Sequence, residues 1–292
     1  MPLVNSNVIL ADARRRRYGI PSLLAGDLQM IVGGVQAAEA LRSPLILAFN
    51  SGATSGVPLP IGIALAANAA AKASVPVGVI LDHGADIEQI VAAICNGASS
   101  VMFDGSHLPF EENVRQTCEI VRIAHAAGVD VEAELGTIGG SSIYLTAEGP
   151  QAHMTDPEQA AEFVARTGID VLAISFGNAH GVYHTKPKLD LARAREIAGR
   201  VEIPLAMHGA SGLEDAVYAE VIAGGVSKIC YYTAMGRQIS AALRDFTAQA
   251  DPDTLNYHQI IAVATDEFCR RAKDLITLLG GAGKAEDMKR MT

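Results

Sequence analysis

The stretch Val75–Gly97, VPVGVILDHGADIEQIVAAICNG, joins an apolar run to a helical pattern through Asp82, His83 and Gly84. A continuous apolar run of this length is typical of a strand in a parallel sheet, because helices cover both faces of such a sheet. The spacing of apolar residues after Gly84 fits an amphipathic helix. The stretch therefore predicts one β/α unit whose strand ends in a carboxylate and an imidazole.

The same alternation continues along the chain. Eight apolar or β-branched segments alternate with helical patterns, and no linker rich in proline or serine separates them. The predicted strands are Tyr18–Leu24, Pro44–Phe49, Val77–Leu81, Ser99–Phe103, Val129–Glu134, Asp170–Phe176, Ile203–Met207 and Val226–Tyr231. An open doubly wound sheet would alternate in the same way, but no G-x-G-x-x-G motif follows the first segment. The pattern predicts a (β/α)8 TIM barrel in a single domain, residues 1–292.

Helix signals are clearest in three places. Thr155 and Glu158 have the spacing of a capping box, which predicts a helix over Asp156–Arg166. After the eighth strand, Ala234–Ala248 and Tyr257–Leu279 also have helical patterns. The second of these lies outside the repeated units, so we expect an additional C-terminal helix beside the barrel.

Charge and hydropathy argue against two classes of partner. The net charge of −9 disfavours a surface for duplex nucleic acid, and we expect the basic run Arg14–Arg17 to be a solvated helix face. The most apolar region, Ile61–Ile80, is interrupted by Asn68 and Lys72 and cannot form a membrane-spanning helix of about 20 apolar residues. No signal-peptide pattern is visible, so we expect a cytoplasmic protein without membrane contact.

The cysteines favour a reduced compartment. The four of them, Cys95, Cys118, Cys230 and Cys269, show no C-x-x-C spacing, which is typical of free thiols rather than of a disulfide framework or a cysteine zinc site. Any metal must therefore rely on other ligands.

Polar side chains at the predicted strand ends carry the chemistry. In a parallel barrel these ends meet on one face, where active sites are built. The polar residues there are Asp82, His83, Asp104, Glu132, Glu134, His180 and His208. Three of the eight histidines are among them, each followed by glycine, and three neutral imidazoles with one open position are the ligand set of a catalytic zinc ion. One such histidine alone is more often structural, but the convergence of three predicts a metal site.

A second group of residues indicates an anion site. HGASGLEDA, His208–Ala216, leads from the seventh strand into a helix, so the backbone N–H groups of Gly209–Gly212 and the helix dipole can hold a phosphate. Thr233 follows the eighth strand, and barrel phosphate sites commonly use the loops after strands seven and eight. An ordinary tight turn is the alternative.

The segment Leu135–Met154 is longer than a simple connection needs, and it contains Gly136, Gly139, Gly140 and Gly149. Long segments of this kind in compact domains are usually lids or binding loops. Disorder is the alternative.

Several motifs together resemble the class II, metal-dependent ketose-bisphosphate aldolases, the family of fructose- and tagatose-bisphosphate aldolases. The matching stretches are LDHG (81–84), DGSHLPFEENV (104–114), VEAELG (131–136), TDPEQAAEFVARTGID (155–170), GNAHGVY (177–183), PLAMHGASG (204–212) and GGAGKAE (280–286). They occur in order over most of the chain. The resemblance implies a barrel enzyme that cleaves a phosphorylated ketose, as a homodimer or homotetramer.

Residue roles follow from this resemblance position by position. His83, His180 and His208 would bind Zn²⁺, with Co²⁺ or Mn²⁺ as alternatives. Asp82 and Glu134 would be catalytic, Asp82 as the acid/base acting on the C4 oxygen and Glu134 in the surroundings of the metal.

The resemblance also assigns a substrate-binding region. Gly181, Gly209, Ser211 and Thr233 would hold the phosphate of dihydroxyacetone phosphate, where the family often also binds a monovalent cation. Cys230 would lie near the bound ketose.

The chain departs from the family pattern in four places, one of which is GGSSIY (139–144), where the family commonly has an acidic residue shortly after E-x-E-L-G. Leu24 stands where the family usually has Asn after the first strand, Ile80 stands where it has His, and Cys230 stands where it has Asn at the end of the eighth strand. A thiol is a weaker hydrogen-bonding group than an amide. The ketose is therefore left open between fructose or tagatose 1,6-bisphosphate and another sugar phosphate, which would yield dihydroxyacetone phosphate or dihydroxyacetone and an aldehyde.

Two other functions compete with the aldolase. A metal-dependent isomerase or epimerase would reprotonate an enediolate without bond cleavage, but it would not need the C4 acid/base that Asp82 provides. A non-catalytic sugar-phosphate binding protein would fit the departures at Leu24 and Cys230.

Overall fold

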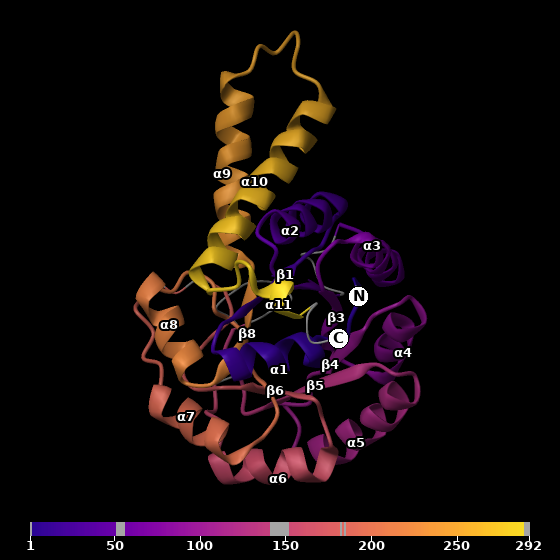
Figure 1. Cartoon of the computed structure of the whole chain (residues 1–292), viewed down its shortest axis with the longest axis vertical. Coiled ribbons are helices and arrows are strands. Elements are labelled where there is room, and N and C mark those ends of the chain that lie inside the picture. Colours follow the sequence, from indigo (N-terminus) through magenta and orange to yellow (C-terminus); the bar gives the residue numbers. More distant parts are fainter. Residues whose placement is uncertain (1, 51–55, 141–151, 182, 184, 289–292) are drawn as a thin grey trace.

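A computed structural model describes residues 2–50, 56–140, 152–181, 183 and 185–288. Its eight strands are parallel and pair in sequence order, and the last strand pairs with the first, so that the sheet closes into a barrel (Figure 1). The strands are β1 (Ile20–Leu24), β2 (Leu45–Phe49), β3 (Val77–Gly84), β4 (Ser100–Phe103), β5 (Asp130–Leu135), β6 (Val171–Ile174), β7 (Leu205–Met207) and β8 (Val226–Tyr231). The predicted (β/α)8 TIM barrel is confirmed, and the open sheet is excluded.

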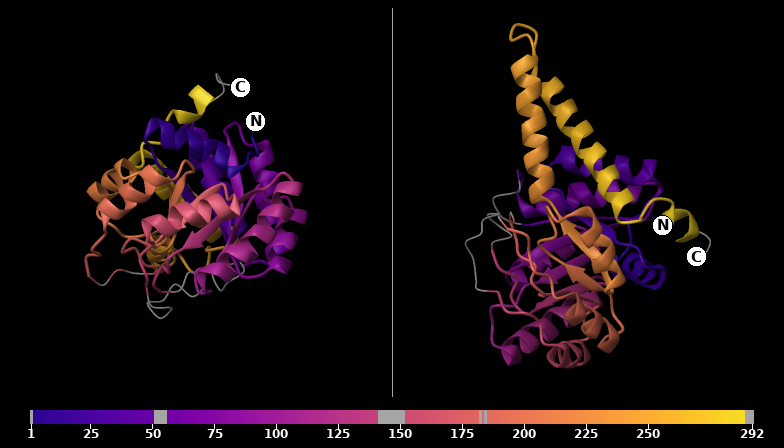
Figure 2. Two further views of the ribbon diagram at one scale, coloured as in Figure 1. Left: turned by 90° about the horizontal axis from the view of Figure 1, so that it is seen from below. Right: turned by 90° about the vertical axis from the view of Figure 1, so that its left-hand side faces the viewer.

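Helices alternate with the strands and form the outer layer of the barrel (Figures 1 and 2). They are α1 (Ser6–Arg16), α2 (Leu28–Ala40), α3 (Leu59–Lys72), α4 (Ile87–Cys95), α5 (Phe110–Ala126), α6 (Pro157–Thr167), α7 (Leu191–Arg200), α8 (Asp215–Ala223), α9 (Thr233–Gln249), α10 (Tyr257–Leu278) and α11 (Lys284–Met288). None of these helices is long and apolar enough to cross a membrane.

The alternation of side chains along each strand produces two cores. Outward-facing residues such as Leu47 and Leu172 pack under the surrounding helices. Inward-facing residues such as Ile46, Ile80 and Met102 fill the barrel and pack with the apolar face of α1. Because α1 lies against β1, β3 and β8, it closes the N-terminal mouth of the barrel. The opposite mouth carries the polar strand ends.

The basic run on α1 is only partly a solvated face. Arg15 and Arg17 are exposed, as predicted. Arg14 is half-buried instead, and its guanidinium donates to the carbonyl oxygens of Ala198, at 3.0 Å, and Ile203. Ala198 is in the last turn of α7, and Ile203 lies three residues after the helix ends. Arg14 therefore donates to carbonyl oxygens that have no partner within the helix.

The predicted capping box of α6 is wrong. Asp156 caps the helix, and its carboxylate accepts the backbone N–H groups of Glu158 and Gln159, each at 2.9 Å. The Thr155 hydroxyl is buried, where it donates to the Leu135 carbonyl and accepts from the Ser175 backbone N–H at 2.8 Å. Thr155 therefore ties the end of β5 to the segment after β6.

The last long helices form a hairpin that projects beyond the barrel (Figures 1 and 2). Both predicted helices are present, as α9 and α10, while α11 was not predicted. The part of α10 nearest the barrel packs closely on α2, where a Cβ at Gly33 would lie 2.8 Å from the Thr265 carbonyl oxygen. The additional C-terminal helix is thus anchored on the barrel at one end only.

Candidate active site

A backbone irregularity brings two adjacent residues of β3 into the same mouth. Asp82 follows Ile80 on the inward face of the strand, and simple alternation would turn His83 outward. However, the pairing of β3 with β4 shifts register between Leu81 and Gly84, and His83 has a φ of 49°. This left-handed conformation costs a non-glycine residue about 1–3 kcal/mol. It directs the His83 imidazole into the mouth, beside Asp82.

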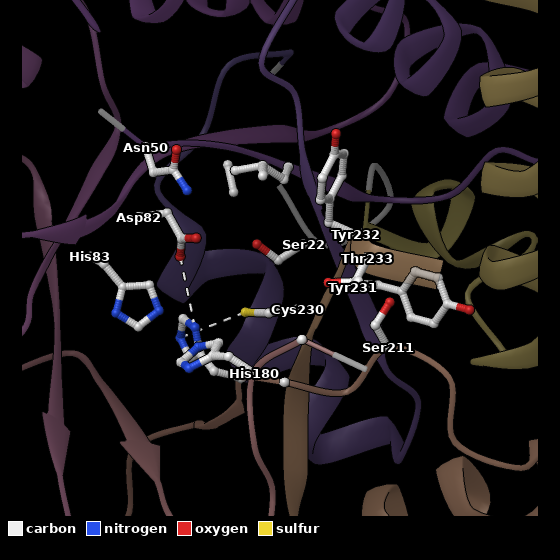
Figure 3. A pocket seen from close by; sticks show the side chains of 15 residues that line it. Ser22, Asn50, Asp82, His83, His180, Ser211, Cys230, Tyr231, Tyr232 and Thr233 are labelled. Atoms are coloured by element: carbon white, nitrogen blue, oxygen red, sulfur yellow. Dashed lines mark hydrogen bonds and ion pairs between the residues drawn. The ribbon is translucent and has the colours of Figure 1, made fainter. Parts of the chain in front are cut away.

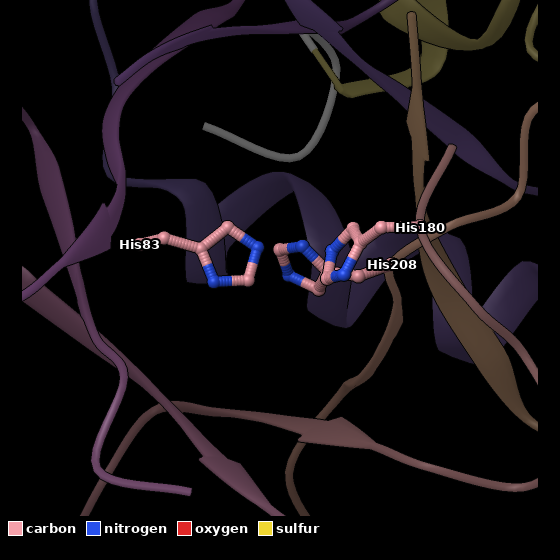
Figure 4. Close-up of side chains that lie close together, drawn as sticks. All are labelled: His83, His180 and His208. Carbon is pink, nitrogen blue, oxygen red and sulfur yellow. The ribbon is translucent and has the colours of Figure 1, made fainter. Parts of the chain in front are cut away.

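Three imidazoles converge in this mouth (Figure 4). His83 comes from β3, His208 follows β7 directly, and His180 comes from the segment after β6. The His83 ring centroid lies 5.0 Å from that of His180 and 4.6 Å from that of His208, with each pair of rings edge to face. One ring nitrogen of each residue lies within 4.8 Å of those of the other two. The arrangement directs ring nitrogens, rather than ring faces, toward a shared centre.

The unpaired ring nitrogens test whether this set fits a metal. Among the described residues, Nε2 of His83 and Nε2 of His180 are buried and have no hydrogen-bond partner. A buried acceptor without a partner is costly unless something else satisfies it. Burial and the neighbouring His83 lower the pKa of His180 and of His208, which keeps both rings in the neutral form that binds metals. The donor set fits a divalent cation.

Carboxylates orient two of the imidazoles. His83 Nδ1 lies 2.8 Å from Asp104 Oδ2, and Asp104 also accepts the Ser106 hydroxyl at 2.7 Å. Burial disfavours the charged ring of His83, but the bond to Asp104 and nearby carboxylates outweigh it and raise the pKa of His83 to about 9. A pKa of about 9 favours the doubly protonated ring at neutral pH, and a bound cation would replace the proton on Nε2 while Asp104 would keep the one on Nδ1. Such carboxylate partners fix the orientation of metal-binding imidazoles.

A buried ion pair holds the second of these imidazoles, that of His208. Glu132 Oε1 lies 2.8 Å from Nε2 of His208, and Glu132 Oε2 accepts the Lys228 ammonium at 2.6 Å. The side chains of Glu132 and Lys228 are at most 1% exposed. Burial alone would raise the pKa of Glu132, but Lys228 and His208 lower it to about 2. Glu132 therefore stays ionised and leaves Nδ1 of His208 facing the mouth.

The two residues predicted to be catalytic lie in different surroundings. Asp82 lines the pocket, its Oδ1 has no hydrogen-bond partner among the described residues, and it lies 3.9 Å from Nδ1 of His208 (Figure 3). Glu134 does not line that pocket, although one of its oxygens lies within 4.8 Å of His83 and Asp104 ligand atoms. Burial and the charge of Asp104 raise the pKa of Glu134 well above its usual value. Asp82 alone of the two faces open space.

The predicted phosphate-binding residues line the same pocket (Figure 3). They are Gly181, Gly209, Ser211 and Thr233. Ser211 Oγ accepts the backbone N–H of Ala234 at 2.8 Å, which places the hydroxyl at the start of α9. The sequence predicts an anion at the helix that follows Ser211, but no residue of α8 lines this pocket. The N-terminus of α9 is the helix end that faces it.

The segments that carry His180 and His208 are fastened to each other. Asn178 Nδ2 donates to the His208 carbonyl at 3.0 Å, and the Tyr183 hydroxyl donates to the Gly209 carbonyl at 2.7 Å. Gly209 has a φ of 65°, and a Cβ there would lie 2.1 Å from the Ala179 carbonyl oxygen. Only glycine permits this approach.

Gly209→Ala is expected to lower the free energy of unfolding. The left-handed backbone alone costs a residue with a Cβ roughly 1–2 kcal/mol. The clash of that Cβ with the Ala179 carbonyl adds to this cost. Phosphate affinity should fall as well. Thermal denaturation and dihydroxyacetone phosphate titration measure the two effects. Gly199→Ala is the control, since a Cβ at Gly199 meets nothing within 4 Å. Equal stability of the two variants would contradict the prediction.

Asp104→Asn is expected to weaken metal binding by about 10–100-fold, because the amide no longer fixes the Nδ1 proton of His83 through a charged acceptor. Competition with a chromogenic chelator measures the affinity. Asp266→Asn, on the exposed face of α10, is the matched control. Unchanged affinity in Asp104→Asn would show that Asp104 does not orient the ligand.

Other pocket residues divide into those anticipated and those missed. Leu24 and Cys230 line the pocket, whereas Ile80 lies in the barrel core and does not. Cys230 Sγ lies 3.6 Å from Nε2 of His208, and burial raises the pKa of the Cys230 thiol. The lining residues that sequence reasoning missed are Ser22, Ala48, Asn50, Tyr231 and Tyr232. All four cysteines are free, as expected.

The predicted lid lies largely outside the described residues, since 141–151 are not among them. Its base is described, and there Thr137 and His153 pair through two backbone hydrogen bonds, of 2.8 and 2.9 Å. The two ends of the segment are therefore held together next to Glu134.

Comparisons with known proteins point in one direction. A family description, "Fructose-bisphosphate aldolase class-II", matches residues 4–284. The protein YdjI of Escherichia coli K12 is 38% identical over 275 residues, which span 94% of this chain and 96% of YdjI. A crystal structure of the YdjI aldolase superposes with a TM-score of 0.86 and 35% identity, covering 97% of this chain and 99% of that one. The fructose-bisphosphate aldolase of Campylobacter jejuni, 22% identical with a TM-score of 0.80 over 97% of each chain, shares the fold.

Proposed function

The chain belongs to the class II fructose-bisphosphate aldolase family, and from that premise we propose that it is a metal-dependent aldolase that cleaves a phosphorylated ketose into dihydroxyacetone phosphate and an aldehyde. The observation that carries the proposal is that Asp82, three imidazoles and the anion-binding residues line one pocket. The pocket thereby offers one substrate an anion site for its phosphate, metal-binding imidazoles near its carbonyl and a proton acceptor.

The three histidines would hold the metal in this proposal. His83 and His180 would bind through Nε2, and His208 through Nδ1. Zn²⁺ is the expected ion, with Co²⁺ or Mn²⁺ as alternatives. When bound, it supplies a Lewis acid that stabilises the negative charge developing on the ketose oxygens.

The phosphate would be held at the start of α9. Backbone N–H groups at Gly181 and Gly209, the Ser211 hydroxyl and the N-terminal residue Thr233 offer donors for a dianion. Fixing the phosphate fixes the carbon chain beside Asp82, which is the positioning that an aldol cleavage requires.

Asp82 would move the proton of the reaction. The C3–C4 bond breaks and its electron pair remains on C3, giving an enediolate, while the C4 hydroxyl gives its proton to the Asp82 carboxylate and becomes the aldehyde carbonyl. C3 then takes up a proton to give dihydroxyacetone phosphate, and Asp82 releases its proton, so that none is gained or lost overall. In support of this role, the Oδ1 atom of Asp82 lacks a hydrogen-bond partner among the described residues, and Asp82 lines the pocket.

Exchange of the C3 proton of dihydroxyacetone phosphate in D₂O tests the proposal, because it needs no aldehyde. NMR should show exchange with the zinc-loaded protein, its loss after a chelator, and its return when Zn²⁺ is added. His180→Ala should remove exchange and metal together, whereas His258→Ala, at an exposed position of α10, should retain both. Absence of exchange in the loaded protein, or full exchange after verified metal removal, would refute the function.

A further inference from the structure

We infer that the ketose carries one phosphate, the one retained on dihydroxyacetone phosphate, and that the aldehyde released bears none. The inference rests on the proposed function and concerns its substrate class. The inference comes from comparing the anion site at the start of α9 with the rest of the pocket lining, which has no cation.

One anion site is built into the pocket. Ser211 and Thr233 meet at the start of α9, a helix of 17 residues whose dipole favours an anion there. Gly181 and Gly209 complete this part of the lining with backbone that has positive φ. These residues account for a single phosphate group.

The rest of the lining offers no cation for a second phosphate. Among the residues that line the pocket in the described part of the chain there is no lysine or arginine, and Asp82 contributes a negative charge. A second phosphate monoester would bring a charge of about −1.5 to −2 at neutral pH. Proteins usually meet such a charge with arginine or lysine. A bisphosphate would therefore place its second phosphate in unfavourable surroundings near Asp82.

Three of the basic side chains are paired away from the pocket. Lys228 lies deeper in the barrel, with its ammonium 2.6 Å from Glu132. Lys186 pairs with Glu214 at 2.7 Å and lines a separate hollow beside α8. Arg271 lies 3.2 Å from Glu267 and lines another hollow beside α9 and α10. None of these three lines the pocket that holds Asp82.

Two further segments of the chain carry no basic side chain of this kind. Residues 51–55 (SGATS) and 141–151 (SSIYLTAEGPQ) contain no lysine or arginine.

Neutral groups line the rest of the pocket instead. Ser22, Asn50 and Tyr232 offer hydroxyl and amide groups, while Leu24 and Ala48 contribute apolar surface. Such a lining suits the hydroxyl groups and carbon chain of an uncharged sugar aldehyde.

The inference is tested by comparing aldehydes with and without a phosphate as substrates of the wild-type, zinc-loaded protein. Condensation of dihydroxyacetone phosphate is measured with D-glyceraldehyde and longer unphosphorylated aldoses, and with D-glyceraldehyde 3-phosphate. The cleavage direction is measured with fructose 1-phosphate against fructose 1,6-bisphosphate. We expect kcat/KM for the best unphosphorylated aldehyde to exceed that for glyceraldehyde 3-phosphate by about tenfold or more.

The outcomes separate this inference from the proposed function. Equal or faster condensation with glyceraldehyde 3-phosphate would overturn the inference. Efficient cleavage of fructose 1,6-bisphosphate would overturn it as well, and a second copy of the chain that supplies the missing cation would produce that result. In either case C3 exchange of dihydroxyacetone phosphate would persist, and the aldolase function would stand. Loss of that exchange would refute the function itself.

Discussion

Asp82→Asn should lower the rate of ketose cleavage by about 10²–10⁴-fold, the range that a positioned acid/base contributes. The amide keeps the size of the side chain but cannot take the C4 proton. Because the three histidines, and not Asp82, would hold the metal in the proposed function, zinc content should be unchanged. C3 exchange of dihydroxyacetone phosphate should also survive, since that step does not involve C4.

Measuring cleavage, exchange and zinc on the same preparation makes this prediction specific. Asp253→Asn, in the exposed turn between α9 and α10, is the matched control and should behave as wild type. If cleavage and exchange fell together, Asp82 would have a role in enolisation or folding rather than at C4. If cleavage were undiminished, the acid/base assignment would be wrong.

Lys228→Met should destabilise the protein by about 3–5 kcal/mol, the usual cost of leaving one partner of a buried ion pair without its counterion. Glu132 would then be a buried carboxylate without its cation, held only by His208. Protonation of Glu132 would relieve that cost and weaken its hold on His208. Chemical denaturation of the metal-free protein gives the stability, and chelator competition gives the zinc affinity.

A second substitution distinguishes lost pairing from lost packing. In Lys228→Met/Glu132→Gln no charge remains at the pair, and the amide oxygen can still accept from Nε2 of His208, so most of the stability should return. Lys186→Met is the control, because its exposed partner Glu214 makes a surface pair that contributes about 0–1 kcal/mol. If the double variant were as unstable as Lys228→Met, the loss of stability would come from packing rather than from the ion pair.

The sequence predicted those features that depend on local pattern. The strand and helix periodicities were sufficient to predict the barrel. The rule that strand ends share one face was sufficient to select His83, His180 and His208, which the structure brings together. The rule did not predict how β3 continues to Gly84, because the left-handed turn at His83 depends on a register shift against β4.

Features that depend on contacts across the barrel were not accessible from the sequence. Lys228 reads as one polar residue in an apolar strand, and its partner Glu132 lies three strands away along the barrel wall. Asn178 has no motif that indicates its bond to the His208 carbonyl. The anion site was assigned to the nearest helix in sequence, whereas closure of the barrel brings α9 to it. A lysine at an inward strand position is the signal that would have directed attention to the ion pair.

The position of α1 constrains the order in which this fold can be assembled. The helix precedes every strand in the chain, yet it packs on β1, β3 and β8 and completes the inner core. Its binding surface does not exist until β8, the last strand to leave the ribosome, has paired with β1. Ile9 and Leu10 are therefore among the earliest residues synthesised and among the last to be buried, which makes docking of this helix a late, long-range step in folding.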